Sequence, residues 1–445
     1  MKLTIEKIVY GGQGLARIPE AEGALAGKRI FVPFTLPGEQ VIAKLDFAAR
    51  AQDKRGYATG SLQQIELASP LRVQPACPHF THCGGCQLQH ATYAGQLEMK
   101  RDVLREALER SGVRQLPKIS LLHGDPLAYR NRMRVHVQTH PNIAIGYREK
   151  EAHTIVPIAQ CSIVAPLLQR CLNALREMGE AGSIPDGLEE IECFTNHDGS
   201  AVLLSAFTPQ STPQFLNACE KFFIRIAGKI PELSGAALMQ RGMGRAASFH
   251  TQTLLRWKAQ GLDYRVGTQT YRVSIGSFFQ VNQSLLPTFV AQIAKVAKEW
   301  SGQQAWDLYA GVGLFSRVLA EKFSQVTAVE IAPAAVDDLR HNLAGLPATI
   351  VASTTEDFLR HALEQRNVSP DLALLDPPRA GLGLEGVNLL ARCRPKRIVY
   401  VSCDPATLSR DLKALIESGY RLDRLHMVDM FPQTYHQETI AVLVR

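Results

Sequence analysis

The sequence predicts a multi-domain α/β protein, and three observations along its 445 residues support this fold class. Short strands broken by Gly and Pro fill the first 60 or so residues, and strand-like runs dominate from 129 to about 260. From about 285, strands alternate with helices. Because the chain is too long for one ordinary core, we expect three domains, at 1–62, 63–275 and 276–445.

The first predicted domain is a small β-barrel. The runs LTIEKIVY, RIFVPF and EQVIAKLDF alternate polar and apolar residues, with turns at Gly11-Gly12 and Pro37-Gly38. Short strands separated by such turns are typical of a barrel.

The second predicted domain is a sheet-rich α+β region. A helix is expected at 94–112, where apolar residues recur at helical spacing before a Gly stop. The runs RVHVQ, AIGYR, IECFTN and AVLLSAF predict strands. Arg130, Arg132 and Arg134 alternate, so they share one strand face. That face either tracks the phosphates of a polyanionic partner or is simply solvated.

The third predicted domain is a doubly wound parallel sheet. Strands WDLY, VTAVE, LALLD and RIVYVS alternate with helix-like segments such as FSRVLAEKF and AAVDDLRHNL. Ligands of such sheets bind at the carboxyl ends of the strands.

Composition narrows the class of protein. The chain has 46% hydrophobic and 20% charged residues, a net charge of +7, and no apolar run long enough to span a bilayer. The start, MKLTIEKIVYGG, lacks the apolar stretch of a signal peptide, so we expect a cytoplasmic protein without membrane partners. The mild basic excess is compatible with a polyanionic partner.

A glycine turn follows the first strand of the third domain, at Asp307-Leu-Tyr309-Ala-Gly311-Val-Gly313. Glu330, 17 residues beyond Gly313, ends the next strand and is placed to accept hydrogen bonds from ribose. Ser316 stands where a dinucleotide fingerprint has its third Gly, which favours S-adenosylmethionine over NAD. An ordinary strand–helix connection remains the alternative.

Two further strand ends carry reactive groups. Asp376-Pro377-Pro378-Arg379 either fixes a carboxylate over a planar base or is only a rigid turn. Cys403 precedes a predicted helix, whose N-terminus would lower the thiol pKa and favour a nucleophile. A buried structural cysteine is the alternative, and Asp404 would raise the thiol pKa if it pointed inward.

The segment FPQTYHQE (431–438) places His436 and Glu438 on one face if it is extended. Either side chain is a candidate general base.

Three of the nine cysteines crowd into ten residues, at Cys77, Cys83 and Cys86, and Cys161 follows 75 residues later. The odd number argues against a disulfide framework. The spacing is nearer to an iron–sulfur pattern than to the paired Cys-x2-Cys of a zinc ribbon.

Taken in order, these motifs resemble the RNA 5-methyluridine methyltransferases, which modify 23S ribosomal RNA and the tRNA T-loop. The matching segments are FFQVN (278–282), DLYAGVGLFS (307–316), DPPRAG (376–381), VSCDPATLSRD (401–411) and FPQTYHQE (431–438). GGQGLAR (11–17) with VPFTLPGE (32–39) resembles a TRAM domain, an OB-like RNA-binding barrel. The resemblance implies a Rossmann-like class I methyltransferase domain at the C-terminus.

The resemblance also implies site residues. Cys403 matches the nucleophile that attacks carbon 6 of uracil, and Glu438 matches the base that removes the proton from carbon 5. The positions that match the S-adenosylmethionine pocket are Gln280, Tyr309, Gly311, Gly313, Glu330 and Asp376. Some family members hold a 4Fe-4S cluster at the pattern of Cys77, Cys83, Cys86 and Cys161, and zinc is the second choice.

The TRAM-like segment and the cysteines favour 23S rRNA as the partner, with tRNA as the alternative, and we expect a monomer with a flipped target uridine. The family often has Asn where this chain has Leu314 and Asp404, and another polar position that contacts the cofactor aligns loosely near Thr354. The competing hypotheses are a non-catalytic RNA-binding assembly factor and an iron–sulfur redox enzyme. The intact Cys403 and Glu438 argue against the first, and the lack of a nicotinamide or flavin fingerprint argues against the second.

Overall fold

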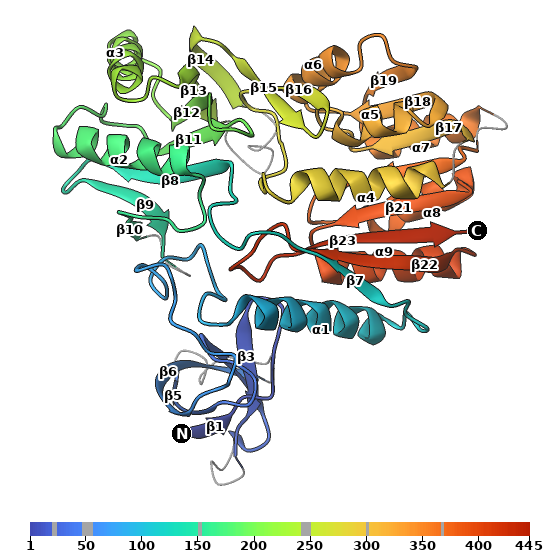
Figure 1. The fold of residues 1–445 in the computed structure, drawn as a ribbon, viewed down its shortest axis with the longest axis horizontal. Helices are drawn as coiled ribbons and strands as arrows, with labels where there is room; N and C mark the ends of the chain where they lie inside the picture. The colour runs from blue at the N-terminus through green and yellow to red at the C-terminus, as the bar shows by residue number, and fades with distance from the viewer. Residues whose placement is uncertain (20–24, 47–56, 150–153, 242–250, 300–301, 366–368) are drawn as a thin grey trace.

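The computed structural model describes residues 1–19, 25–46, 57–149, 154–241, 251–299, 302–365 and 369–445. In this part of the chain, sheets of six, seven, two and eight strands follow one another, with helices packed against the two largest (Figure 1). None of the described helices is both long and apolar enough to cross a membrane.

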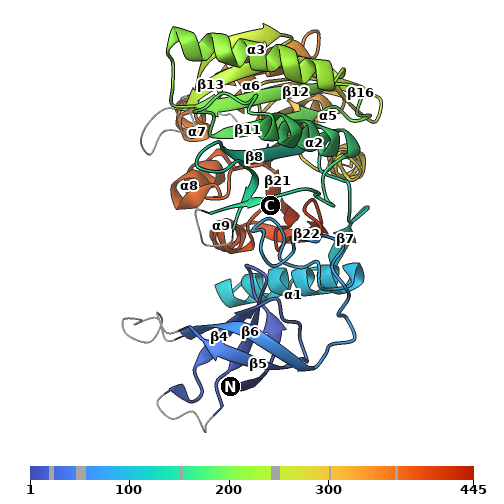
Figure 2. The same ribbon diagram turned by 90° about the vertical axis from the view of Figure 1, so that its left-hand side faces the viewer.

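The N-terminal sheet lies at one end of the molecule, beyond helix α1 (Tyr93–Ser111) (Figure 2). It has the order β1-β5-β6-β4-β3-β2 and surrounds its own apolar core. Its strands are β1 (Lys2–Thr4), β2 (Lys7–Ile8), β3 (Gln13–Arg17), β4 (Arg29–Pro33), β5 (Gln40–Leu45) and β6 (Tyr57–Leu67). Strand β6 thus continues past the domain boundary expected at residue 62.

The central sheet has the order β10-β9-β8-β11-β12-β13-β14 and is antiparallel except between β12 and β13. Its strands are β8 (Arg132–Gln138), β9 (Ala144–Arg148), β10 (Ile155–Pro157), β11 (Glu190–Thr195), β12 (Val202–Thr208), β13 (Leu233–Arg241) and β14 (Thr251–Lys258). The predicted strands in this region are confirmed.

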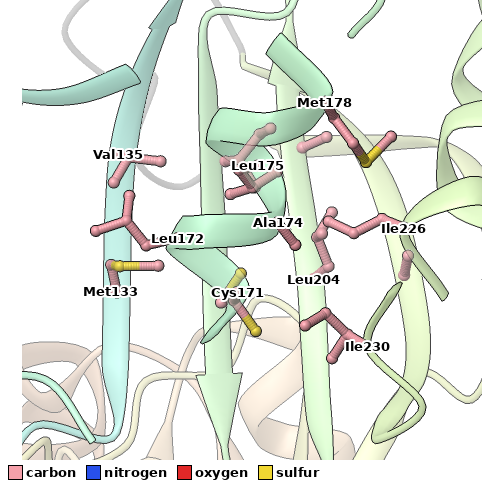
Figure 3. Packing of buried hydrophobic residues seen from close by; sticks show 14 of the residues in the cluster. Met133, Val135, Cys171, Leu172, Ala174, Leu175, Met178, Leu204, Ile226 and Ile230 are labelled. Atoms are coloured by element: carbon pink, nitrogen blue, oxygen red, sulfur yellow. The ribbon is translucent and has the colours of Figure 1, made fainter. Parts of the chain in front are cut away.

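Helices α2 (Pro166–Glu180) and α3 (Pro213–Lys229) cover one face of the central sheet and were not predicted. Figure 3 shows side chains of α2, among them Leu172 and Leu175, turned toward β8 and β12. Each helix begins with Pro at its first position, a recognised start signal that the neighbouring strand-like runs obscured.

The C-terminal sheet has the order β19-β18-β17-β20-β21-β23-β22-β7. Its strands are β7 (Ile119–Leu122), β17 (Gly302–Leu308), β18 (Phe323–Glu330), β19 (Ala348–Ala352), β20 (Leu372–Leu375), β21 (Arg397–Ser402), β22 (Arg421–Val428) and β23 (Glu438–Val444). Strands β17 to β21 are parallel, and β23 is antiparallel to both of its neighbours. The predicted alternation of strands and helices is confirmed.

Helices pack on both faces of this sheet, which makes it doubly wound (Figure 1). One face carries α4 (Leu286–Lys298), α5 (Leu314–Ala320) and α6 (Pro333–Asn342). The other carries α1, α7 (Thr355–Glu364), α8 (Gly383–Cys393) and α9 (Pro405–Glu417). The helix expected at 94–112 is α1, and Gly112 ends it in the left-handed conformation.

Three elements of the expected central domain pack on the C-terminal sheet instead. Helix α1 contributes to its core, and β7 pairs with β22. The hairpin of β15 (Gly261–Val266) and β16 (Gln269–Ser274) donates backbone N–H groups to Asn342 and Asp338 of α6. The domain division at 62 and 275 stays a prediction, and these contacts favour assigning α1, β7 and the β15–β16 hairpin to the C-terminal domain.

Candidate active site

The predicted site residues gather at the carboxyl ends of the parallel strands. Cys403 directly follows β21, and Glu438 begins β23. Ser402 pairs with Thr439 in the antiparallel ladder, so the next position along β21, Cys403, lies opposite Glu438. Asp376 directly follows β20, the other neighbour of β21. The sheet therefore brings together groups that are up to 62 residues apart in the chain.

Asp376 is held by Gln280, which reaches the strand end from the segment before α4. The Gln280 amide donates to Asp376 Oδ2 at 3.2 Å, and Gln280 itself is buried. Burial raises the pKa of Asp376 to about 7, although the hydrogen bond from Gln280 opposes the shift. Near neutral pH this carboxyl therefore exists in both protonation states.

The Cys403 side chain is a protonated thiol near neutral pH. Burial raises its pKa to about 12, and the charges of Glu438 and Asp376 add to the shift, whereas Arg379 opposes it. The expectation that a helix N-terminus leaves this thiol with a lowered pKa is therefore wrong. Burial and nearby carboxylates outweigh the helix end.

Asp404 points into the N-terminus of α9 rather than at the thiol. Its Oδ1 accepts hydrogen bonds from the backbone N–H groups of Ala406 and Thr407, at 2.8 and 3.0 Å. Such capping satisfies amides that the helix itself leaves unpaired. Among the charges that shift the Cys403 pKa, that of Asp404 acts more weakly than those of Glu438, Asp376 and Arg379.

Glu438 is buried, and its Oε2 has no hydrogen-bond partner among the described residues. Burial raises its pKa well above the ordinary value, the charge of Asp376 raises it further, and Arg379 lowers it. A buried carboxyl with a raised pKa is typical of a proton-transfer group.

His436, the other candidate base, is half-buried next to Arg379. The guanidinium lies 3.2 Å from His436 Nε2. Burial, and then the charge of Arg379, lower the pKa of His436 to about 4. The ring is therefore neutral at pH 7, and its ring nitrogen is occupied by Arg379.

The glycine turn between β17 and α5 has an unusual backbone. Tyr309, Gly311 and Gly313 all have positive φ, at 66°, 55° and 90°. A Cβ on Gly313 would come within 2.8 Å of Leu339, whereas a Cβ on Gly311 would meet nothing within 4 Å. Gly313 is thus required by packing, and the turn at Gly311 faces open space that a ligand can occupy.

Glu330 reaches back from the end of β18 to this turn. Its Oε2 accepts the Gly311 N–H at 2.9 Å, and its Oε1 accepts the N–H groups of Ile331 and Ala332. Oε2, which accepts only one of these hydrogen bonds, has a further lone pair for a ligand hydroxyl. The pairing holds the acidic side chain beside the open face of the turn.

Asp307 and Ser316, at the two ends of the turn, were not predicted as site residues. Asp307 is fully buried and accepts a hydrogen bond from Ser316. Burial raises the pKa of Asp307 to about 7, and its Oδ1 has no described partner. Ser316, which stood out only as a missing Gly, ties the strand end to α5.

Tyr309 and Thr354 complete the edge of this region. The Tyr309 hydroxyl donates to Glu356 at 3.3 Å, and burial raises its pKa. Thr354 caps α7 by accepting the Asp357 N–H at 3.0 Å. The polar group near Tyr309 is therefore Glu356, two residues from the loosely aligned Thr354.

The four clustered cysteines line one cavity of about 250 Å³, although they come from two distant segments. The apolar neighbours are Phe80, Met133, Tyr147, Ile158 and Ile163. Burial raises the pKa of Cys83 to about 11 and that of Cys86 to about 12. Among the described residues no three His, Cys, Asp or Glu side chains are close enough to hold a single metal ion.

The arginine row of β8 does not form a free cationic face. Arg132 Nη1 pairs with Glu192 Oε1 at 2.9 Å, and Arg134 Nη2 pairs with Glu192 Oε2 at 2.7 Å. Burial alone would raise the pKa of Glu192, but the two guanidinium groups lower it. Arg132 is therefore largely buried in an ion pair that neither reading of the row predicted, whereas Arg134 is paired and also exposed to solvent. Contact of the row with RNA stays a prediction. Arg130 lines the cysteine cavity.

Comparisons with known proteins agree with the arrangement. A family model described as tRNA (Uracil-5-)-methyltransferase matches residues 243–445. The chain is 31% identical to an uncharacterized RNA methyltransferase of Aquifex aeolicus, over 100% of this chain and 98% of the relative. It is 33% identical to the 23S rRNA (uracil(1939)-C(5))-methyltransferase RlmD of Alkalilimnicola ehrlichii, over 100% and 96%.

A solved structure is similar over nearly the whole length. The Pyrococcus abyssi tRNA (uracil-54, C5)-methyltransferase, in complex with S-adenosyl-L-homocysteine, has a TM-score of 0.74 and 24% identity, and the match covers 99% of each chain. This likeness supports the fold. The full-length relatives and the family match lead further: the chain belongs to the family of RNA uracil-C5 methyltransferases.

Proposed function

We propose that this enzyme methylates carbon 5 of a uridine in 23S rRNA, using S-adenosylmethionine and a covalent bond between Cys403 and carbon 6. The observation that carries the proposal is the meeting of Cys403, Glu438 and Asp376 at adjoining strand ends. A nucleophile next to two carboxyls with raised pKa values suits a reaction that moves protons on and off one pyrimidine.

Attack by Cys403 is the first proposed step. Because the thiol pKa is about 12, the proton must pass to a carboxylate as sulfur bonds to carbon 6. Of the two acidic neighbours whose charges act most strongly on the thiol, Asp376 takes this proton, so that Glu438 stays ionised for the last step; Asp376 returns the proton to sulfur when the thiolate leaves. Electron density from the carbon 5–carbon 6 double bond then moves onto carbon 5, which becomes nucleophilic.

Glu438 acts in the last proposed step. Once carbon 5 carries the methyl group, the ionised carboxyl removes the remaining proton from that carbon. The carbon 5–carbon 6 double bond re-forms, the bond from carbon 6 to sulfur breaks, and the Cys403 thiolate leaves. Burial and Asp376 keep the Glu438 carboxyl basic enough for this transfer.

The methyl donor fits the glycine turn. Gly311 leaves open space beside the backbone, and Glu330 is already oriented there by three backbone N–H groups. S-adenosylmethionine supplies an electrophilic methyl carbon when it is bound. We assign Tyr309, Gln280 and Asp376 to the same pocket, with Gln280 fixing the Asp376 carboxyl.

We assign a 4Fe-4S cluster to the cysteine cavity, with zinc as the second choice. Four cysteines from two distant segments line one space of about 250 Å³. A multi-metal cluster needs thiolates spread around a larger body than one tetrahedral ion does. Cys77, Cys83, Cys86 and Cys161 would hold the cluster, with a structural or RNA-positioning role. If removing the iron left both folding and RNA binding intact, this role would be wrong.

The choice of 23S rRNA over tRNA rests on the rRNA enzymes among the full-length relatives, and on the N-terminal sheet, which we assign to a TRAM-like barrel. The decisive experiment incubates the enzyme and tritiated methyl donor with separate 23S rRNA and tRNA from strains that lack these modifications. We expect label on one 23S uridine. Label on tRNA alone would move the assignment to the T-loop enzymes.

A further inference from the structure

Three segments contact one another next to Glu438, and only one of them leads into a residue of the proposed reaction. The catalytic loop, residues 431–437, leads directly into Glu438. The barrel turn, residues 9–13, connects β2 to β3 in the N-terminal sheet. The Cys-rich loop, residues 77–90, carries three of the clustered cysteines.

The Cys-rich loop holds the catalytic loop through its backbone. The N–H groups of Gln87 and Leu88, which follow Cys86 directly, both donate to the carbonyl of Gln433, at 3.1 and 2.9 Å. Gln433 has a φ of 71°, a conformation that non-glycine residues rarely adopt. These bonds therefore help to hold the catalytic loop in an unfavourable shape.

Helix α1 also forms hydrogen bonds with the catalytic loop. Gln96 donates to the side chain of Gln433 at 2.9 Å and accepts its backbone N–H at 3.0 Å. Lys100 donates to Asp429 and to the carbonyl of Phe431, at 2.6 and 3.0 Å, and is buried.

The barrel turn packs between these parts. The ring of Tyr10 meets that of Tyr435 edge-on, with centroids 5.1 Å apart. Gly12 is buried, and a Cβ on it would come within 2.8 Å of Gln87 Cβ and 3.5 Å of Tyr435 Cβ. The turn thus touches the Cys-rich loop and the catalytic loop at one point.

The barrel turn also reaches the nucleophile side of the site. Burial raises the pKa of Tyr10, and the charge of Asp404 and its hydrogen bond with the Tyr10 hydroxyl raise it further. Asp404 is the cap of α9 and the residue after Cys403. Tyr10 therefore contacts both sides of the reacting pair, Tyr435 before Glu438 and Asp404 after Cys403.

We propose that the barrel turn positions the two reacting groups, Cys403 and Glu438. Tyr10 contacts Tyr435 of the catalytic loop and the helix cap Asp404, and Gly12 packs between the catalytic loop and the Cys-rich loop. We call this set of contacts the brace. The N-terminal barrel is then part of the reaction's scaffold as well as an RNA-binding module. Tyr10 and Gly12 are positioning residues: neither touches the uracil. The inference rests on the proposed roles of Cys403 and Glu438.

Gly12→Ala tests the brace, and Gly11→Ala is its matched control. Both positions have positive φ, at 77° and 106°, so both variants carry backbone strain. Only at position 12 does the added methyl group strike neighbouring atoms, because nothing lies within 4 Å of a Cβ on Gly11. Displacement of reacting groups by about 1 Å costs on the order of 100-fold in rate.

In single-turnover assays with saturating RNA we expect Gly12→Ala to lower the rate of methyl transfer ten- to 100-fold relative to Gly11→Ala. RNA affinity should stay within about threefold. Equal rates in the two variants would overturn the proposal. So would a Gly12→Ala defect that saturating RNA restores, because the turn would then serve RNA binding alone.

Hydrogen exchange supplies a readout that does not depend on activity. We expect faster exchange of amides in residues 431–437 of full-length Gly12→Ala than of Gly11→Ala, and unchanged exchange there would contradict the brace. If Gly12→Ala does not fold, Tyr10→Ala takes its place. Its control is Tyr57→Ala, whose ring meets Phe31 within the barrel at a similar 5.2 Å. Failure of the proposed function differs from either result, since wild-type enzyme itself would then leave carbon 5 unlabelled.

Discussion

The protonation state of Cys403 offers a quantitative test of the site. With a pKa of about 12, only about one thiol in ten thousand is ionised at pH 8. An ordinary thiol of pKa about 8.5 is roughly one-quarter ionised at that pH. A thiolate of higher pKa is intrinsically more nucleophilic, which recovers roughly 40-fold. Alkylation of Cys403 in the free enzyme should therefore be on the order of 50-fold slower than that of an ordinary thiol.

Glu438→Gln removes the charge that, after burial, raises this pKa most. The thiol pKa should fall, and alkylation at pH 8 should accelerate by about threefold for each unit of the fall. The assay follows iodoacetamide labelling of the Cys403 peptide by mass spectrometry between pH 7 and about 10. Glu417→Gln is the control. It removes an exposed carboxylate at the far end of α9, the helix that follows Cys403, and should leave the alkylation rate unchanged.

Two results would refute this reasoning. Wild-type Cys403 that reacts as quickly as an ordinary exposed thiol would show that the site already stabilises thiolate. Slower or unchanged alkylation in Glu438→Gln would show that its carboxylate does not act on the thiol. Cys403→Ala identifies the label that belongs to the other cysteines.

Three further outcomes are expected. Glu438→Gln should accumulate RNA covalently attached to protein, visible as a slowly migrating band on a denaturing gel, because the last proton cannot leave; absence of the band counts against this base. Gly311→Ala and Gly313→Ala both carry the strain of a positive φ, so both should lower the melting temperature, and Gly313→Ala should lower it further because of its packing clash with Leu339. Only Gly311→Ala puts its methyl group into the open space beside the turn, so it should raise the KM for methyl donor relative to Gly313→Ala; equal KM values would argue against a methyl-donor pocket at this turn. Lys100→Met leaves the buried Asp429 without its partner and should lower the free energy of unfolding by about 3–5 kcal/mol in urea titrations, and a loss under about 1 kcal/mol would contradict a buried pair.

Four strands of the C-terminal sheet, β17, β18, β20 and β21, were predictable because each is a short apolar run next to a turn signal or a helix-like segment. Strands β7, β19, β22 and β23 of the same sheet were not predicted. The ends of β17, β18, β20 and β21 all fall within a residue or two of the predicted motifs. Parallel strands share one functional edge, so the ends could be grouped without knowing their order. Helices α2 and α3 were not predicted, because the strand-like apolar runs next to them in the sequence hid their helical spacing.

The electrostatics of the site were not predictable in the same way. The effect of Asp404 on the Cys403 thiol pKa depends on where the Asp404 carboxylate points. Only the fold shows that this carboxylate caps α9. The partner of Arg132 and Arg134 is Glu192, on a neighbouring strand about 60 residues away, and no local pattern connects them. The thiol pKa likewise depends on Glu438 and Asp376, which meet Cys403 only through sheet pairing.

The measurement that tests the central claim most directly is the position of a transferred methyl group. Wild type and Cys403→Ala are each incubated with tritiated methyl donor and RNA from a modification-deficient strain, and the labelled nucleoside is then identified. The account predicts 5-methyluridine with wild type and no label with Cys403→Ala. Label on cytidine, or undiminished labelling by Cys403→Ala, would contradict it.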